Sequence, residues 1–267
     1  MLVPEMFGVM AIAFVFMTGL TLLSDLGLSQ NVIQSRRGNS PVFLNTVWSV
    51  QVLRGAGVFA VALMVAMTLY LASGLLPSGT AYAEPILPPV LAVLAFTAVI
   101  TAFESTRLSF ARRNLDQAWL VRIDLVSTVA SLLAMVAWAS VDRSVWALVA
   151  GAYASTLVRT LLSHVVLAGH PDRFGWDWDS LVEIRSFGKW IVVSSLLGFI
   201  VLQGDRILIG GLRDAQTLGV YAIAVTLAGV LDALINKLVS DITLPALSEV
   251  ARDRRDRLAT TFYRFHL

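Results

Sequence analysis

Four ionisable side chains lie inside stretches of sequence that otherwise carry almost no charge: Arg54, Arg159, Asp205 and Arg206. A charged side chain in hydrocarbon costs about 2.5 to 3.5 kcal/mol on insertion scales, so such residues usually face a cavity or a partner. Arginine keeps its charge in any environment and can donate two parallel hydrogen bonds to a phosphate or carboxylate. We therefore take these residues as candidates for the path of an anionic substrate, with Arg54 as the best single candidate. The alternative is that they snorkel or pair with neighbours, as the adjacent Asp205 and Arg206 could.

A second polar set lies near the C-terminal end of the sequence. Asp232 and Asn236 stand four residues apart, as do Lys237 and Asp241, so each pair shares a helical face. This stripe could line a central cavity or bind a coupling proton or sodium ion. It could also mark the end of the helix as it leaves the membrane.

The residue types give little support for a catalytic site. The chain has no cysteine, its three histidines show no metal-ligand spacing, and no glycine-rich phosphate loop is present. We expect no metal and no cofactor. The run Trp-Asp-Trp-Asp at 176–179 could supply paired carboxylates. It is the one feature of the sequence that would support an integral-membrane transferase acting on lipid-linked sugars. A solvated loop anchored by its tryptophans is the simpler interpretation of that run.

The composition indicates which elements must position these residues. Hydrophobic residues make up 57% of the chain and charged residues only 14%, against about 25% charged in soluble domains. Apolar stretches long enough to span a membrane predict an all-α, polytopic helical bundle with about seven transmembrane helices. Their predicted ranges are 7–23, 46–72, 86–103, 119–141, 144–168, 189–212 and 217–243.

The Lys and Arg residues between these stretches predict the orientation. The connections 24–45, 104–118 and 169–188 and the tail 246–267 hold twelve basic residues, whereas the connections that alternate with them hold two. Because cytoplasmic loops carry the excess of Lys and Arg, the rich segments are expected inside. The N-terminus of the chain is then periplasmic and its C-terminus cytoplasmic. The basic residues are scattered over loops, so we expect no nucleic-acid partner.

Tryptophans and small residues give further structural expectations. Five tryptophans fall near predicted helix ends, where they would anchor at the lipid headgroups: Trp48, Trp119, Trp138, Trp146 and Trp190. Small residues around Gly55 and Gly57 predict close helix packing.

Part of 176–188 is expected to form an interfacial helix. Its membrane side would include Trp178 and Ile184.

Two short blocks of the sequence hint at an internal duplication. Residues 4–13 and 215–224 match at five of ten positions, with Gly8 aligned to Gly219. Transporters are commonly built from two repeated halves. With an outside N-terminus and no basic segment before it, we expect an upstream span and infer that the chain is a fragment of a longer protein.

Several motifs resemble a known family: VPEMFGVMAIA, DLGLSQNVIQ, GDRILIGGLRDAQTLGVYAIA and LPALSEV. They are similar to the Wzx-type flippases for lipid-linked oligosaccharides, within the multidrug/oligosaccharidyl-lipid/polysaccharide exporter superfamily. The resemblance implies two six-helix bundles around a central cavity, through which a polyprenyl-diphosphate-linked sugar unit moves between leaflets. It also implies that Asp205 and Arg206 correspond to the Asp-Arg of the family's seventh helix.

These observations together predict the organisation and function. Residues 1–188 would form most of a first bundle, with five spans and a cytoplasmic linker, and 189–267 the start of a second bundle, with two spans and a tail. The chain would belong to a flippase of the bacterial inner membrane, not an enzyme, with membrane lipid, a polymerase and glycosyltransferases as partners. The alternatives are a drug or ion-coupled exporter of the same superfamily and the transferase.

Overall fold

The computed structural model describes residues 2–114 and 116–231, and within them the fold is entirely helical. Its helices, in chain order, are α1 (Pro4–Leu23), α2 (Leu28–Gln34), α3 (Pro41–Leu71), the 3-10 turn η1 (Ala81–Ala83), α4 (Leu87–Ala102), α5 (Arg107–Arg113), α6 (Gln117–Val141), α7 (Trp146–Val165) and α8 (Trp178–Leu212). A further helix covers Ala215–Leu231. The predicted all-α bundle is confirmed, because each predicted apolar range contains a helix.

Among residues 2–114 and 116–231, four helical segments are long and apolar enough to cross a membrane: α1, α3, α6 and Ile191–Leu212 of α8. α4 and α5 together would give a fifth span, bent by 62° at the break between them. α7 is helical where predicted but less apolar, and the range 217–243 is described only to 231. Membrane crossing by these last two segments stays a prediction.

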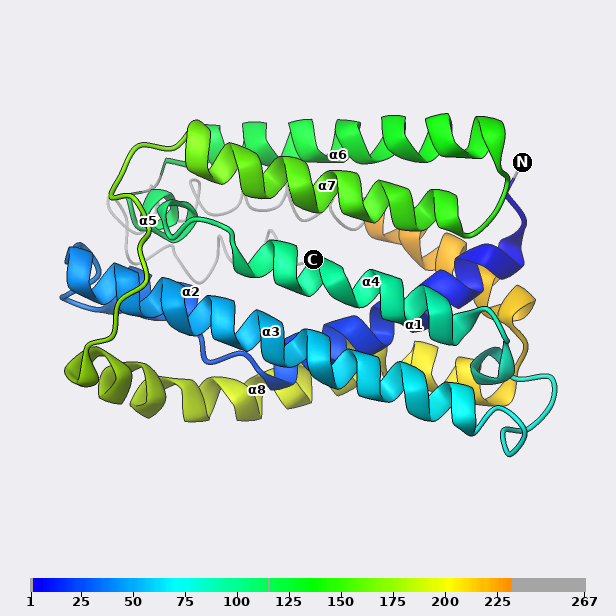
Figure 1. Ribbon diagram of the computed structural model, residues 1–267. Coiled ribbons are helices and arrows are strands. Elements are labelled where there is room, and N and C mark those ends of the chain that lie inside the picture. Colours follow the sequence, from blue (N-terminus) through cyan, green and yellow to red (C-terminus); the bar gives the residue numbers. More distant parts are fainter. Residues whose placement is uncertain (1, 115, 232–267) are drawn as a thin grey trace, which may run out of the picture. The chain divides into compact units, whose positions relative to one another are not determined.

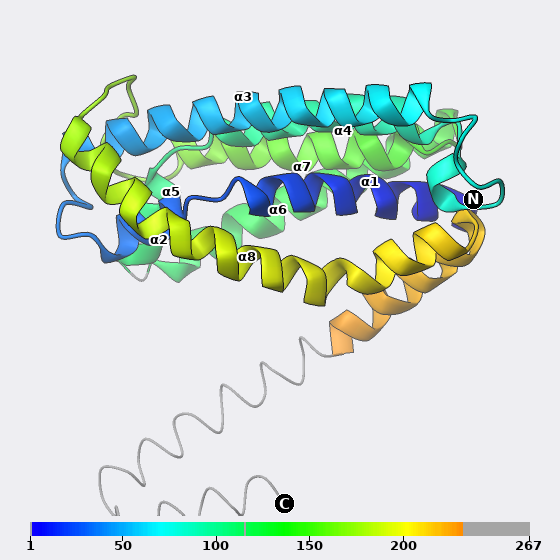
Figure 2. The ribbon, with the colours of Figure 1, turned by 90° about the horizontal axis from the view of Figure 1, so that it is seen from below.

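The chain divides into two compact units, Met1–Val220 and Tyr221–Leu267. Within the first unit α6 packs along α7 and α3 along α4, while α4 also contacts α7 and α1 (Figure 1). Figure 2 shows α1 lying between the layer of α3 and α4 and the long α8. The predicted division of the chain at residue 188 falls inside α8, and it stays a prediction.

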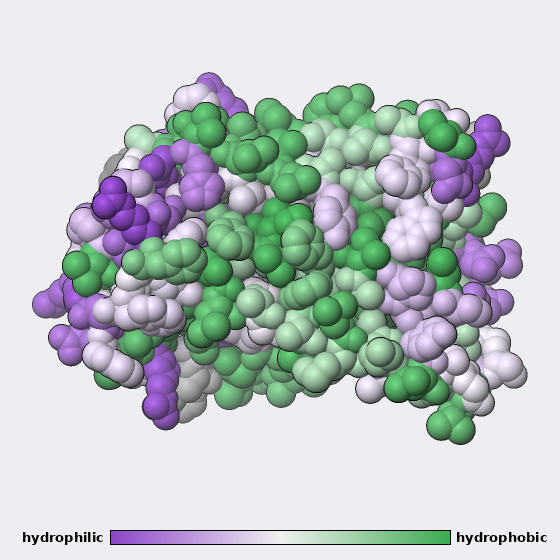
Figure 3. All heavy atoms as spheres, in the orientation of Figure 1, coloured by the Kyte–Doolittle hydropathy of each residue, from purple (hydrophilic) through white to green (hydrophobic). Residues whose placement is uncertain are grey.

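The surface has the polarity expected of a membrane bundle. Apolar side chains cover the middle of the face in Figure 3, and hydrophilic ones gather towards both ends. Large apolar side chains point outwards along the helices, with Leu133 on α6 66% exposed and Val201 on α8 81% exposed. In water such a surface would be costly, whereas lipid tails would cover it.

The interfacial helix predicted for 176–188 is wrong in its boundaries and in its faces. α8 runs without a break from Trp178 to Leu212. Ile184 is buried at 2% exposure and packs with Phe43, Val47 and residues of α2, whereas Trp178 on the other side of the helix is 82% exposed. The physical reason is that α2 and the start of α3 provide an apolar partner for Ile184.

The prediction that Trp48 anchors at the lipid headgroups is wrong. Trp48 is only 7% exposed, and its ring contacts those of Phe103 and Phe174 at centroid distances of 6.0 and 4.7 Å. It therefore packs inside the bundle rather than at the headgroups. Trp119 and Trp138 are 40% and 48% exposed, as anchors would be.

Two glycines make a close crossing between α1 and the helix that begins at Ala215. A Cβ on Gly8 would lie 1.8 Å from the carbonyl oxygen of Ala215, and one on Gly219 would lie 1.7 Å from that of Pro4. The contact is reciprocal, because Pro4 and Ala215 are the first residues of the two matching blocks. The internal duplication itself stays a prediction.

Candidate functional site: a polar cavity between the first helices

A cavity of about 570 Å³ lies between α1, α3 and α4, at the end of the bundle that carries α2 and α5. Most of its lining side chains are hydroxyl, amide or charged groups: Thr18, Thr21, Asp25, Ser29, Gln30, Gln51, Arg54, Thr97, Thr101, Glu104, Ser105, Ser109 and Arg112. Such a volume is typical of small-molecule sites. The cavity is therefore the candidate functional site of the described residues.

Arg54 reaches the cavity wall from the middle of α3. Its Nε donates to Ser24 Oγ at 3.1 Å and its Nη2 to the carbonyl oxygen of Thr21 at 3.1 Å. Its Nη1 lies 3.6 Å from Asp25 Oδ1. The guanidinium thus holds the C-terminal end of α1, whose last carbonyls have no partner within the helix.

The break between α4 and α5 forms another wall of the cavity. Gln51 Nε2 donates to the carbonyl oxygens of Ala102 and Glu104 at 3.0 and 2.9 Å. These bonds satisfy backbone groups that the bend would otherwise leave unpaired. The amide oxygen of Gln51 stays available as an acceptor on the wall.

The loop after α7 holds the same break from the opposite side. The carboxylate of Asp172, whose side chain is 2% exposed, accepts hydrogen bonds from Ser105 Oγ and Thr106 Oγ1, both at 2.5 Å. It also accepts the backbone N–H of Thr106 at 3.2 Å. These hydrogen bonds stabilise the bend, which places Ser105 and Glu104 at the cavity.

Arg159 lies behind the cavity wall rather than in the cavity. Its Nε is 3.0 Å from Glu104 Oε1, and its Nη1 bonds Asp124 Oδ1. Of these three residues only Glu104 lines the cavity. The geometry fits the alternative that Arg159 pairs with neighbours, and it links α7 to the α4–α5 break and to α6.

Asp205 and Arg206 lie on α8, and neither lines the cavity. Asp205 Oδ1 accepts the backbone N–H of Arg206 at 2.8 Å, and Arg206 Nη1 donates to Gln203 Oε1 at 2.8 Å. Arg206 Nε is buried and makes no hydrogen bond to any described residue. The structure thus brings Arg54 to the cavity and leaves Asp205 and Arg206 on another helix. Asp232, Asn236, Lys237 and Asp241 lie outside the described residues.

Arg54 is the one polar cavity residue that the sequence predicts. The others include Asp25, Glu104 and Arg112, and also Gln51. Asp25, Glu104 and Arg112 fall in the predicted connections 24–45 and 104–118. A signal for Gln51 was present, because it is a polar residue one helical turn before Arg54 in the same apolar stretch.

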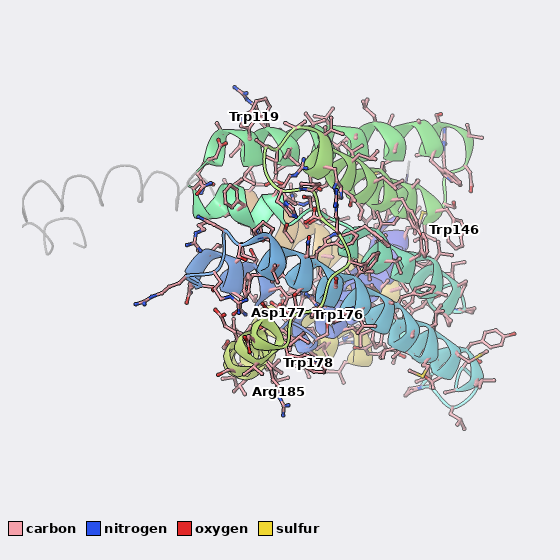
Figure 4. The ribbon with its side chains drawn as sticks, turned by 60° about the vertical axis from the view of Figure 1, so that its left-hand side comes forward. Trp119, Trp146, Trp176, Asp177, Trp178 and Arg185 are labelled. Carbon is pink, nitrogen blue, oxygen red and sulfur yellow. The ribbon has the colours of Figure 1, made fainter. Side chains whose placement is uncertain are left out.

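The Trp-Asp-Trp-Asp run has a structural role at the start of α8 (Figure 4). Asp177 Oδ2 accepts hydrogen bonds from Ser180 Oγ at 2.6 Å and Ser180 N at 3.0 Å, and it pairs with Arg37 at 2.9 Å. The hydrogen bonds from Ser180 and from Arg37 hold the pKa of Asp177 below its usual value. Asp177 is thus a helix cap held as a carboxylate, which is unsuited to proton transfer near neutral pH. No cluster of three metal-ligating side chains occurs in the described ranges.

The chain matches one protein family over almost its whole length. The sequence profile of a family described as "Polysaccharide biosynthesis protein" matches residues 1–266. The chain belongs to this family. It is 23% identical over 262 residues to the succinoglycan biosynthesis transport protein ExoT of Rhizobium meliloti (strain 1021), covering 95% of this chain and 49% of that protein.

A second relative is the lipopolysaccharide biosynthesis protein WzxC of Escherichia coli (strain K12), 21% identical over 259 residues, which cover 97% of this chain and 50% of WzxC. The chain thus spans about half the length of the curated relatives it matches. No solved structure gives a significant match.

Proposed function

We propose that the chain is part of a flippase that moves lipid-linked oligosaccharides, built on a polyprenyl diphosphate, across the bacterial inner membrane for surface polysaccharide synthesis. The observation that carries the proposal is a polar cavity of about 570 Å³ inside a bundle with an apolar exterior. The names of two relatives, a succinoglycan transport protein and a lipopolysaccharide biosynthesis protein, support the substrate class.

The cavity suits transport because it separates the two parts of such a substrate. The hydrophilic head group would occupy the cavity, where hydroxyl, amide and charged side chains replace its water. The polyprenyl tail would stay in lipid against the exposed apolar side chains and need not be desolvated. Alternating access would then expose the cavity first to one side of the membrane and then to the other.

With the basic segments on the cytoplasmic side, as the excess of Lys and Arg predicts, the cavity would lie near the cytoplasmic face. α2 and α5 lie in the predicted cytoplasmic connections, and both contribute to the cavity wall. Lipid-linked sugars assembled at that face would enter from there. Arg54 would contact the head group directly, Arg159 would position Glu104, and Arg206 would act elsewhere along the path.

A drug exporter of the same superfamily would favour cationic substrates and hence an acidic cavity. The lining here holds Arg54 and Arg112 against Asp25 and Glu104, so it is not acidic. The capping role of Asp177 leaves a membrane transferase without an acid–base pair in the 176–179 run.

The test is complementation with the full-length protein. Replacing Arg54 or Arg206 with alanine should abolish surface polysaccharide in a strain lacking the native gene, while immunoblots show the protein still in the membrane. Arg143, an exposed residue between α6 and α7, provides a matched control whose replacement should leave the polymer normal. Normal polymer from both test variants would refute the proposed roles.

A further inference from the structure

We infer that the cavity between α1, α3 and α4 binds the uncharged sugar units of the head group rather than its diphosphate. The inference rests on the proposed function and assigns a part of the substrate to this site. It departs from the simple expectation that intramembrane arginines attract the anionic diphosphate. Three features of the cavity carry it: its charge balance, the bonding of Arg54 and the types of its uncharged side chains.

The ionic side chains of the lining balance one another. It contains two arginines, Arg54 and Arg112, and two carboxylates, Asp25 and Glu104. Asp25 lies beside Arg54, so a bound phosphate would meet a negative charge close to the positive one. A diphosphate brings at least two negative charges and is favoured by a surplus of cations, which this lining does not offer.

Arg54 uses two of its five N–H donors in hydrogen bonds to the protein, and a third nitrogen lies near a carboxylate. Its Nε and Nη2 donate to Ser24 Oγ and to the Thr21 carbonyl, and its Nη1 faces Asp25. Phosphate recognition by arginine relies on two parallel N–H groups that point at the ligand. Releasing them would leave the last carbonyls of α1 and the carboxylate of Asp25 without these partners.

The remaining polar groups suit a sugar. Hydroxyl groups of Thr18 and Thr101 can each donate and accept, as sugar hydroxyls do. The hydroxyl of Thr97 donates to the carbonyl oxygen of Leu94 and can still accept. The amide oxygen of Gln51 and the carboxylate of Asp25 add acceptors, which a phosphate without protons could not use. Apolar lining residues such as Val58 offer contacts for the C–H faces of a sugar ring.

The diphosphate would then be held outside this cavity. Arg206 on α8 is a candidate for that contact, because its Nε is buried without a hydrogen bond to any described residue. A substrate held in this way has its sugars between α1, α3 and α4 and its charged group beside α8. The cavity therefore selects the sugar, while cations elsewhere select the lipid-linked diphosphate.

The experiment measures protection of one cysteine in the cavity. The chain contains no cysteine, so Thr101→Cys can be the single reactive thiol in full-length protein freed of any others and placed in lipid nanodiscs. Its rate of maleimide labelling is compared with three probes: the lipid-linked oligosaccharide extracted from the producing cells, the polyprenyl diphosphate without sugar, and inorganic pyrophosphate. Binding of each probe is also measured separately by thermal stabilisation of the protein.

We expect the lipid-linked oligosaccharide to slow labelling at least about tenfold, and the two probes without sugar to change it less than twofold. Equal protection by polyprenyl diphosphate or by pyrophosphate would overturn the inference. So would a lipid-linked oligosaccharide that stabilises the protein without protecting the thiol, and in that case the proposed function would stand. If the oligosaccharide neither stabilises nor protects, the proposed function itself fails.

A change of charge in the cavity provides a second, independent test, because sugar binding and diphosphate binding predict opposite changes in affinity. Asp25→Asn keeps the shape of the side chain but leaves Arg54 without its carboxylate partner, making the cavity cationic. If the cavity binds sugar, affinity for the lipid-linked oligosaccharide should fall, by about tenfold for a lost hydrogen bond to a charged group. If it binds the diphosphate, affinity should rise, which would contradict the inference. Asp142→Asn, in the exposed connection between α6 and α7, is the control and should change nothing.

Discussion

Replacement of Arg159 with methionine should destabilise the bundle and so separate two possible roles of this residue. Arg159 bridges Glu104 and Asp124, and the side chains of Arg159 and Glu104 are only 26% and 15% exposed. Methionine keeps most of the length and apolar volume but removes the charge. Glu104 then remains largely buried without its cation.

The expected cost is about 3 kcal/mol in the free energy of unfolding. Removing one partner of a buried ion pair typically costs about 3 to 5 kcal/mol, and the partial exposure of this pair puts it at the lower end. The double variant Arg159→Met with Glu104→Gln leaves no buried unpaired charge, because Asp124, which also loses its cation, is 58% exposed. It should therefore recover about 2 kcal/mol of the loss. Arg143→Met, at an exposed position, should lie within about 0.5 kcal/mol of the original protein.

The assay is equilibrium unfolding of the full-length protein in mixed micelles, combined with measurement of surface polysaccharide. If Arg159 positions Glu104, stability and transport should both fall in the single variant, and stability should return in the double variant. A single variant as stable as the original protein but inactive in transport would refute the reasoning. It would place Arg159 in contact with the substrate.

Two other perturbations test the packing and the charges. Gly8→Ala places a Cβ against the Ala215 carbonyl, which cannot move without shifting a helix, so we expect a loss of about 1 to 3 kcal/mol in unfolding experiments. Gly57→Ala has open space, and a neutral or stabilising result of up to about 1 kcal/mol is expected there; equal effects would disprove the close crossing. The pKa of Asp177 is lowered by hydrogen bonds from Ser180 and an arginine, so its stabilising effect is present above its unfolded pKa of about 3.9 and is lost as the pH falls through the lower folded value. The unfolding midpoint of Asp177→Asn should therefore lie below that of the original protein at pH 7 and converge with it below about pH 4; a constant gap would contradict this assignment.

The long apolar helices could be predicted from the sequence, because the cost of charge in lipid keeps charged residues out of membrane-spanning segments. It could not tell which apolar side chains face lipid and which face protein, since both environments favour the same residues. Ile184 and Trp48 show this limit: each looked suited to the membrane surface, and each packs inside the bundle. Ile184 is buried because it packs against α2 and the start of α3, and Trp48 because Phe174 of the loop after α7 covers its ring.

The candidate site was predictable in part. Arg54 stood out because a charge inside an apolar stretch is rare, and the structure places it at the cavity wall. Asp25, Glu104 and Arg112 did not, because they fall in segments between spans, where charges are usually solvated. α2 and α5 are short helices that fold back against the ends of the spans, which brings these loop charges to the same cavity. Such a return of the chain has no signature in hydropathy.

The most direct test of a water-filled cavity within the membrane bundle is the labelling of Thr18→Cys, a cavity residue in the apolar α1. In inside-out membrane vesicles, a charged maleimide that cannot cross lipid should label this thiol, whereas Leu133→Cys on the outward face of α6 should stay unlabelled. Labelling of Leu133→Cys but not Thr18→Cys, or labelling of Thr18→Cys only from the opposite side of the membrane, would contradict the account.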